Sequence, residues 1–190
     1  MKFFHIADTH LGAVPDDGFA WSEERKTEIW ESFRSVVAKA DREEADLLLI
    51  AGDLFHRQPL MRELKEVNYL FSTLKKTKVV FIIGNHDYLK VDSYYLDFPW
   101  SENVTCLKGK ECQSVVFEDL DTEIYGLSYH SREIREAKYD HLQPEKKAGF
   151  LFWWCVSSDH PSDGRFGCVQ RAWLHIRKHE NEKHLPYVPG

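Results

Sequence analysis

The sequence lacks the features that mark several classes of protein. Its four cysteines include no CxxC pair, so neither a disulfide framework nor a zinc ribbon is indicated. It contains no low-complexity tract, which argues against a disordered chain. Its first apolar run, residues 2–7, is too short for a signal peptide or a membrane span. These absences predict a cytoplasmic globular domain without membrane association.

The sequence also lacks an excess of basic residues. Its 25 Lys and Arg residues stand against 31 Asp and Glu residues, which gives a formal net charge of −6. Non-specific duplex binding depends on cationic side chains that neutralise phosphates, so this balance does not by itself indicate a nucleic-acid partner. Two bound divalent cations would offset part of the negative charge. The basic stretches at 75–78 and 108–110 are expected to be solvated surface.

The apolar pattern predicts alternating strands and helices in the first half of the chain. Near-continuous apolar runs at 2–7, 47–51 and 79–83 predict buried strands. Apolar residues at helical spacing predict one helix from Ser22 to Ala40 and another over 61–76. This order is typical of an α/β domain with a parallel sheet covered on both faces. Further short strands are expected at 103–106, 113–118, 122–128 and 150–156.

Polar residues with metal-binding side chains follow each of these three strands. Asp8 and His10 follow the first, Asp53 the second, and Asn85 and His86 the third. Ligands in open α/β sheets bind outside the carboxyl ends of the strands, so these side chains are expected to meet there. Their oxygen and imidazole donors suit manganese, iron or zinc. The sequence therefore predicts a metal site at this edge of the sheet.

Each of these motifs has an ordinary structural explanation when it is taken alone. An Asp-x-His pair is most often surface polarity, and Gly-Asp is a common turn. Asn-His-Asp after a strand is also typical of a loop with side-chain capping. The three motifs in this order, each at a strand end, favour the metal site.

The same motifs resemble those of a known family. The segments 8–10, 52–53 and 84–87 resemble the calcineurin-like metallophosphoesterases. The longer strings HIADTHLG, AGDLFH and GLSYH, which begin at His5, Ala51 and Gly126, resemble the SbcD-type nuclease subunit of double-strand-break repair. The resemblance covers residues 1 to about 149. It implies a metallophosphoesterase-type layered β-sheet core with flanking helices, and a metal site at the carboxyl ends of the strands.

The resemblance also implies a role for each motif residue. Asp8 and His10 would hold the first of two divalent ions, most often Mn²⁺, and Asp53 would bridge both ions. Asn85 would bind the second ion. His86 would be the catalytic histidine, with Asp87 holding it near the leaving oxygen. His56 matches a position linked to handling of the DNA end, although an ordinary surface histidine is the alternative.

The second half of the sequence departs from the family pattern. Two further histidine motifs are expected, but His160 lies late and precedes a proline. His175 aligns with the first histidine of the last motif, whereas Arg177 replaces its final histidine. A guanidinium cannot coordinate a metal ion. The segment of about 150–177 is atypical, while 178–190 resembles the family again. A local frame slip in the gene would explain this block, and genuine divergence is the alternative.

We expect residues 1–190 to form a single metallophosphoesterase (nuclease) domain without the family's capping domain. The resemblance implies a DNA exonuclease and endonuclease that acts on DNA ends and hairpins. It further implies a homodimer that works with an SbcC-like ATPase subunit. Two alternatives stay open at this point. One is a phosphoesterase for a non-DNA substrate, and the other is a catalytically impaired homologue that serves as a DNA-binding or scaffold subunit.

Overall fold

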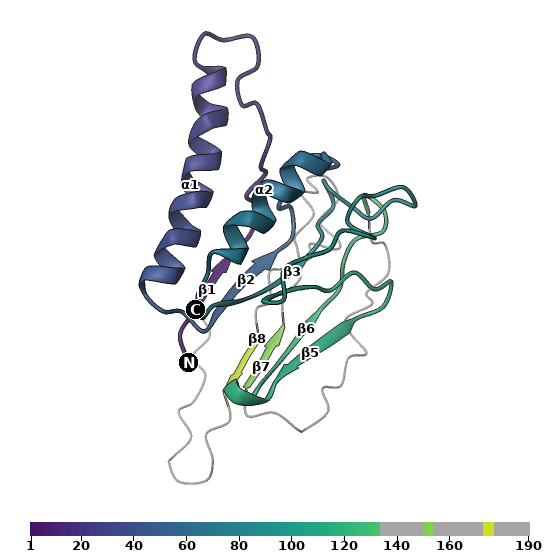
Figure 1. The fold of residues 1–190 in the computed structure, drawn as a ribbon. Helices are drawn as coiled ribbons and strands as arrows, with labels where there is room; N and C mark the ends of the chain where they lie inside the picture. Colours follow the sequence, from purple (N-terminus) through teal and green to yellow (C-terminus); the bar gives the residue numbers. More distant parts are fainter. Residues whose placement is uncertain (134–149, 154–172, 177–190) are drawn as a thin grey trace, which may run out of the picture.

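The computed structural model describes residues 1–133 and two further strands, at 150–153 and 173–176 (Figure 1). The expectations for His160, Arg177 and 178–190 lie outside these residues. Within the described part, no helix is both long and apolar enough to span a bilayer. The elements in chain order are β1 (Phe3–Ile6), α1 (Ser22–Arg42), β2 (Leu47–Ala51), α2 (Met61–Ser72), β3 (Lys78–Ile82), β4 (Val104–Cys106), β5 (Gln113–Phe117), a short 3-10 helix η1 (Glu118–Leu120), β6 (Thr122–Gly126), β7 (Phe150–Trp153) and β8 (Trp173–Ile176).

The first sheet is parallel, and the predicted site lies at the carboxyl ends of its strands. Its strand order is β1-β2-β3-β4, and all three pairings are parallel. All five residues of β2 are buried, as expected for a central strand of a parallel sheet. Because neighbouring strands run in the same direction, the loops after β1, β2 and β3 leave the sheet at the same edge. The α/β fold class predicted from the sequence is confirmed.

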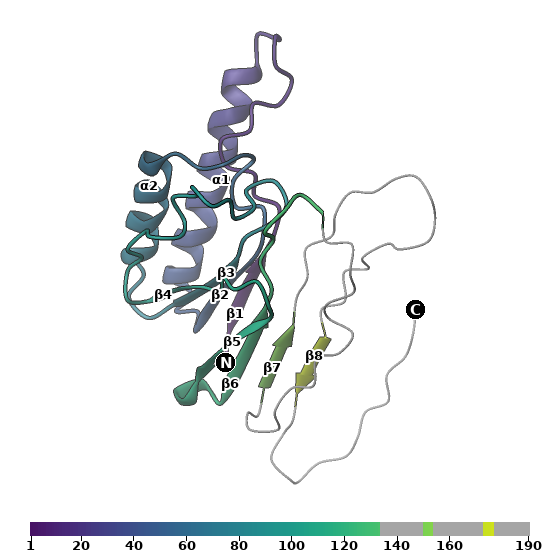
Figure 2. The same ribbon diagram turned by 90° about the vertical axis from the view of Figure 1, so that its right-hand side faces the viewer.

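Different layers cover the two faces of this sheet (Figures 1 and 2). Both helices lie on one face, where the aromatic rings of Phe33 in α1 and Phe71 in α2 pack at 6.0 Å between centroids. On the other face, Leu49 and Ile82 pack with Ile124 of the second sheet. That second sheet has the order β5-β6-β7-β8 and mixes parallel and antiparallel pairs. The parallel sheet is thus buried between helices and a second sheet.

Three details differ from the sequence prediction. The strand at β1 is half-exposed, because it lies at the edge of the first sheet. Helix α2 ends at Ser72, four residues early, where the Ser72 and Thr73 hydroxyls donate to backbone carbonyls of the preceding turn at 2.8 and 2.7 Å. Such hydroxyls compete with the helical backbone and favour its termination. Strand β8 was not predicted, because its four residues give too short a pattern.

Candidate metal centre

The loop after β1 is hydrogen-bonded directly to the loop after β2. The backbone N–H of Asp8 donates to the carbonyl of Gly52 at 3.3 Å, and that of His10 donates to Asp53 at 2.9 Å. Leu11 continues this pairing by donating to the Leu54 carbonyl at 2.9 Å. These bonds fix the backbones that carry Asp8, His10 and Asp53 side by side. The proximity predicted from the strand ends is therefore present in the structure.

The same three residues have a strained backbone conformation. Asp8, His10 and Asp53 have φ angles of 53°, 46° and 47°. This left-handed region is unfavourable for residues with a side chain, although Asp and His are enriched there among non-glycine residues. Such conformations cost about 1–3 kcal/mol each and cluster at functional sites. Here the strain accompanies the convergence of the three side chains.

Asp8, His10 and Asp53 form one group of potential metal ligands. One ligand atom from each lies within 4.8 Å of the others. Asp53 is only 2 % exposed, and its Oδ1 accepts the backbone N–H of His86 at 2.9 Å. The Nδ1 atom of His10 is buried without a hydrogen-bond partner. A buried imidazole nitrogen of this kind is costly unless it binds something. The donor set and this unpartnered atom both fit a divalent ion.

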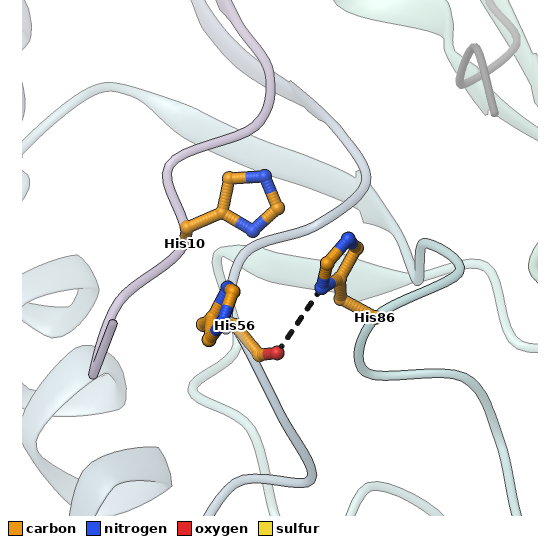
Figure 3. A group of neighbouring side chains, drawn as sticks. All are labelled: His10, His56 and His86. Atoms are coloured by element: carbon orange, nitrogen blue, oxygen red, sulfur yellow. Dashed lines mark hydrogen bonds between the residues drawn. The ribbon is translucent and has the colours of Figure 1, made fainter. Parts of the chain in front are cut away.

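His56 completes a cluster of three histidines with His10 and His86 (Figure 3). The ring centroids of His10 and His86 are 4.7 Å apart, and His56 lies 5.0 Å from His86 and 5.4 Å from His10. Burial, followed by the neighbouring His86 and His10, lowers the pKa of His56 below its ordinary value. Sequence reasoning selected His56 only by resemblance. His56 lies beside the other two histidines because its backbone N–H donates to the carbonyl of Leu11, which follows His10, at 3.1 Å.

The Asp87 carboxyl group is hydrogen-bonded to two backbone N–H groups and to one side chain, and its expected role in holding His86 near the leaving oxygen stays a prediction. Its Oδ1 accepts the Gly84 N–H at 3.0 Å, and its Oδ2 accepts the Phe55 N–H at 3.2 Å and the Tyr95 hydroxyl at 2.7 Å. Burial raises the pKa of the Asp87 carboxyl to about 7, although these hydrogen bonds oppose the shift. Its carboxylate is therefore committed to joining the loops after β2 and β3. The Nδ1 atom of His86 instead faces the backbone carbonyl of His56 at 3.3 Å.

Replacement of Tyr95 by phenylalanine is expected to destabilise this junction. Tyr95 is fully buried, and the change removes the hydroxyl that donates to Asp87. Loss of the partner of a buried polar group costs about 1–3 kcal/mol, so the free energy of unfolding in urea should fall by that amount. The exposed neighbour Tyr94 provides the matched control, because Tyr94→Phe should change stability by less than about 0.5 kcal/mol. Equal stability of the two variants would contradict the assigned role of Asp87.

Gly84 allows the loop after β3 to approach Asp53. A Cβ atom at Gly84 would lie 2.0 Å from Oδ1 of Asp53 and 2.3 Å from its backbone nitrogen. These distances are far inside van der Waals contact, and the backbone atom cannot rotate away. The absence of a side chain at this position is therefore a condition for the bond between Asp53 and the His86 N–H.

Gly84→Ala should consequently move Asp53 and weaken metal binding. We expect the free energy of unfolding to fall by about 1–3 kcal/mol, as for overpacked interiors, and the Mn²⁺ affinity to fall with it. Gly109→Ala is the control, because the three atoms nearest to its Cβ all belong to the flexible side chain of Gln113. Mn²⁺ titration of both variants by calorimetry measures the difference. Unchanged Mn²⁺ affinity in Gly84→Ala would show that Asp53 does not need this approach.

An ion pair and an amide hold the segment that follows His56. Arg57 donates to both carboxylate oxygens of Glu63 in α2, at 2.8 and 3.1 Å. The Gln58 side-chain amide donates to the Tyr88 carbonyl at 2.6 Å. The first contact joins this segment to α2, and the second joins it to the chain just after His86. Together they restrict how far His56 and His86 can separate.

The two remaining predicted ligands are less closely defined. Asn85 is half-buried between Gly84 and His86 in the loop after β3. His175 lies in β8, opposite Leu151 of β7 in the second sheet. The orientation of its side chain lies outside the described part of the chain. The assignment of Asn85 and His175 as ligands of a second ion stays a prediction.

Comparisons with known proteins agree with this geometry. The sequence model of the calcineurin-like phosphoesterase family matches residues 1–180. The chain is 42% identical over 90 residues (46% of the chain) to the DNA double-strand break repair protein Mre11 of Archaeoglobus fulgidus. It is 34% identical over 130 residues (67% of the chain) to the protein of that name from Methanosarcina acetivorans. It is also 30% identical over 151 residues (72%) to the uncharacterized metallophosphoesterase YhaO of Bacillus subtilis. These matches span 19%, 20% and 35% of the respective relatives.

Proposed function

The chain belongs to the calcineurin-like phosphoesterase family, and from this we propose that it is the metal-dependent phosphodiesterase core of a DNA-repair nuclease. The observation that carries the proposal is the convergence of Asp8, His10 and Asp53, with ligand atoms within 4.8 Å of one another. The buried and unpartnered Nδ1 of His10 adds a nitrogen ligand that nothing in the described protein satisfies. Relatives named as double-strand break repair proteins support DNA as the substrate.

The proposed metal ligands follow from the loops that carry them. Asp8, His10 and Asp53 would hold one divalent ion, and Asp53 with Asn85, and His175 from the second sheet, would hold another. We propose Mn²⁺, because mixed carboxylate, amide and imidazole donors suit it. When bound, such ions neutralise charge on a phosphodiester and lower the pKa of a water molecule enough for it to attack phosphorus near neutral pH.

The protein's own side chains would position the reaction. His86 is exposed at the edge of the site, and its backbone is fixed by the bond to Asp53. From that position its imidazole would donate a proton to the departing sugar oxygen, which is the usual task of a general acid. Its exposed neighbour His56 would contact the DNA end.

The partners belong to the same proposal. We propose that the domain processes DNA ends and hairpins in repair and recombination, as a homodimer with an SbcC-like ATPase subunit in the cytoplasm. The formal charge of −6 leaves little cationic surface for the duplex, so the metal ions would supply much of the attraction to phosphate.

Two assays test the activity. Mn²⁺-dependent hydrolysis of a bis-nitrophenyl phosphate diester tests for a phosphodiesterase. Digestion of linear duplex DNA, compared with a cyclic nucleotide, then tests the substrate class. Turnover of both the diester and the DNA is expected. Hydrolysis of the cyclic nucleotide with intact DNA would assign the domain to another phosphoester.

A specific sequence change favours one second candidate. Arg177 replaces the final histidine of the last family motif, which removes one expected ligand. A homologue that binds DNA but does not cleave it is therefore the alternative. It predicts one bound ion or none, binding of duplex DNA, and no turnover of the diester.

A further inference from the structure

The three clustered histidines form a second group of metal-ligand atoms, which overlaps the Asp8, His10 and Asp53 group at His10 alone. One ring nitrogen from each of His10, His56 and His86 lies within 4.8 Å of the others. The three rings come from the loops after β1, β2 and β3 and border a common space (Figure 3). We propose that His10, His56 and His86 bind a zinc ion without Asp8 or Asp53 as ligands. The set of Asp8, His10 and Asp53 is called the carboxylate group below.

One ring nitrogen of His86 has the kind of hydrogen-bond partner that metal-binding histidines use. Its Nδ1 lies 3.3 Å from the backbone carbonyl of His56. A metal-binding histidine usually donates its other ring N–H to a carbonyl or carboxylate, and this fixes which nitrogen carries the lone pair. With Nδ1–H directed to this carbonyl, Nε2 of His86 carries the lone pair. The protein thus already supplies the supporting hydrogen bond of a zinc ligand.

The three residues differ in how freely their side chains can move. His10 is half-buried with its Nδ1 unpartnered, whereas His56 and His86 are exposed. Tetrahedral zinc with Zn–N bonds of about 2.0–2.1 Å places its nitrogen ligands about 3.4 Å apart. The ligand atoms, which lie within 4.8 Å of one another, would therefore approach by up to about 1.4 Å through rotation of the exposed rings. Their exposure leaves a fourth position for water.

The donor chemistry selects zinc over manganese. Three neutral imidazoles without a carboxylate suit zinc, and divalent affinity for nitrogen sites rises strongly from manganese to zinc. The carboxylate group has the opposite metal preference, since two of its three donors are oxygen atoms, which suit Mn²⁺. Two neighbouring sites of different metal preference therefore share one residue, His10.

This sharing has a consequence that rests on the proposed function. Zinc bound to the three histidines would occupy His10 and withdraw His86 from the leaving oxygen. Micromolar zinc should then inhibit Mn²⁺-dependent diester hydrolysis. The binding of zinc itself does not depend on the chain being a nuclease, so the two claims can fail separately.

Equilibrium dialysis with ZnCl₂ alone and with MnCl₂ alone tests the proposal on the wild-type chain and two variants. His56→Ala should lower the zinc affinity by about tenfold or more, the effect expected for loss of a metal-site group, and leave Mn²⁺ affinity unchanged. Asp8→Ala is the matched control and should lower Mn²⁺ affinity while zinc affinity is kept. His56→Gln, which also lacks an imidazole, should repeat the His56→Ala result.

The contrary results are equally specific. Zinc affinity that is unchanged in both His56 variants would overturn the proposal. Zinc affinity that falls in Asp8→Ala as it does in His56→Ala would place zinc in the carboxylate group, and would also overturn it. The visible spectrum of Co²⁺ bound in place of zinc gives a readout without turnover. Intense tetrahedral bands in the wild type that weaken in His56→Ala support the three-histidine site, and a spectrum unaffected by the variant contradicts it.

Discussion

Asp53→Asn is expected to lower the Mn²⁺-dependent turnover of a phosphodiester by about a hundredfold or more, which corresponds to about 2.7 kcal/mol or more of the barrier. Asp53 is the buried carboxylate at the centre of the proposed site, and the amide removes its negative charge. The amide oxygen can still accept the His86 N–H that Oδ1 accepts at 2.9 Å. The local backbone conformation should therefore persist, while the ions that Asp53 is proposed to bridge should no longer bind.

The comparison that isolates this effect uses an exposed carboxylate. Asp119 is a surface residue paired with Lys78 in the layer of the second sheet, so Asp119→Asn should leave turnover near that of the wild type. Mn²⁺ content and the initial rate should be measured for both variants. Wild-type Mn²⁺ content in Asp53→Asn would remove Asp53 from the ligand set.

His86→Ala should separate turnover from metal binding. A positioned general acid contributes about 10²- to 10⁴-fold, so the digestion of linear duplex DNA, whose leaving sugar oxygen needs a proton, should slow by that factor. Mn²⁺ content should stay at the wild-type level, because the Mn²⁺ ligands we propose do not include His86. The backbone N–H that binds Asp53 is also retained in alanine.

His130 lies outside the cluster and faces the Gly109 carbonyl at 3.0 Å, so His130→Ala should keep most of the activity. Loss of Mn²⁺ from His86→Ala would make His86 a ligand, and undiminished turnover would remove it from catalysis. A leaving group of low pKa needs no general acid. The activity of His86→Ala should therefore be partly restored on a substrate with such a leaving group.

The fold could be predicted largely because its elements carry strong local signals. Strand β2 was predicted at its observed bounds, Leu47–Ala51, because a fully buried strand is apolar throughout. Helix α1 begins at Ser22 as predicted, with Glu23 and Glu24 in its first turn. The partial exposure of β1 could not be predicted, because the place of a strand within its sheet depends on pairings that local sequence does not encode.

The convergence of three candidate ligands could be predicted, but the contacts around them could not. Parallel strand ends bring Asp8, His10 and Asp53 together, and this follows from topology alone. The contacts of Asp87 with Phe55 and Tyr95 were not predicted, since these partners come from segments that no local motif connects to it. The clash that Gly84 avoids likewise depends on a tertiary approach to Asp53.

The most direct measurement is the Mn²⁺ stoichiometry of the wild-type chain, by calorimetric titration with parallel elemental analysis. We propose that the loops after β1, β2 and β3 build a two-ion site, whose first ligands are Asp8, His10 and Asp53. We expect two Mn²⁺ ions per chain, with diester turnover that rises as the sites fill. A chain that folds, binds no Mn²⁺ and hydrolyses no diester would contradict it.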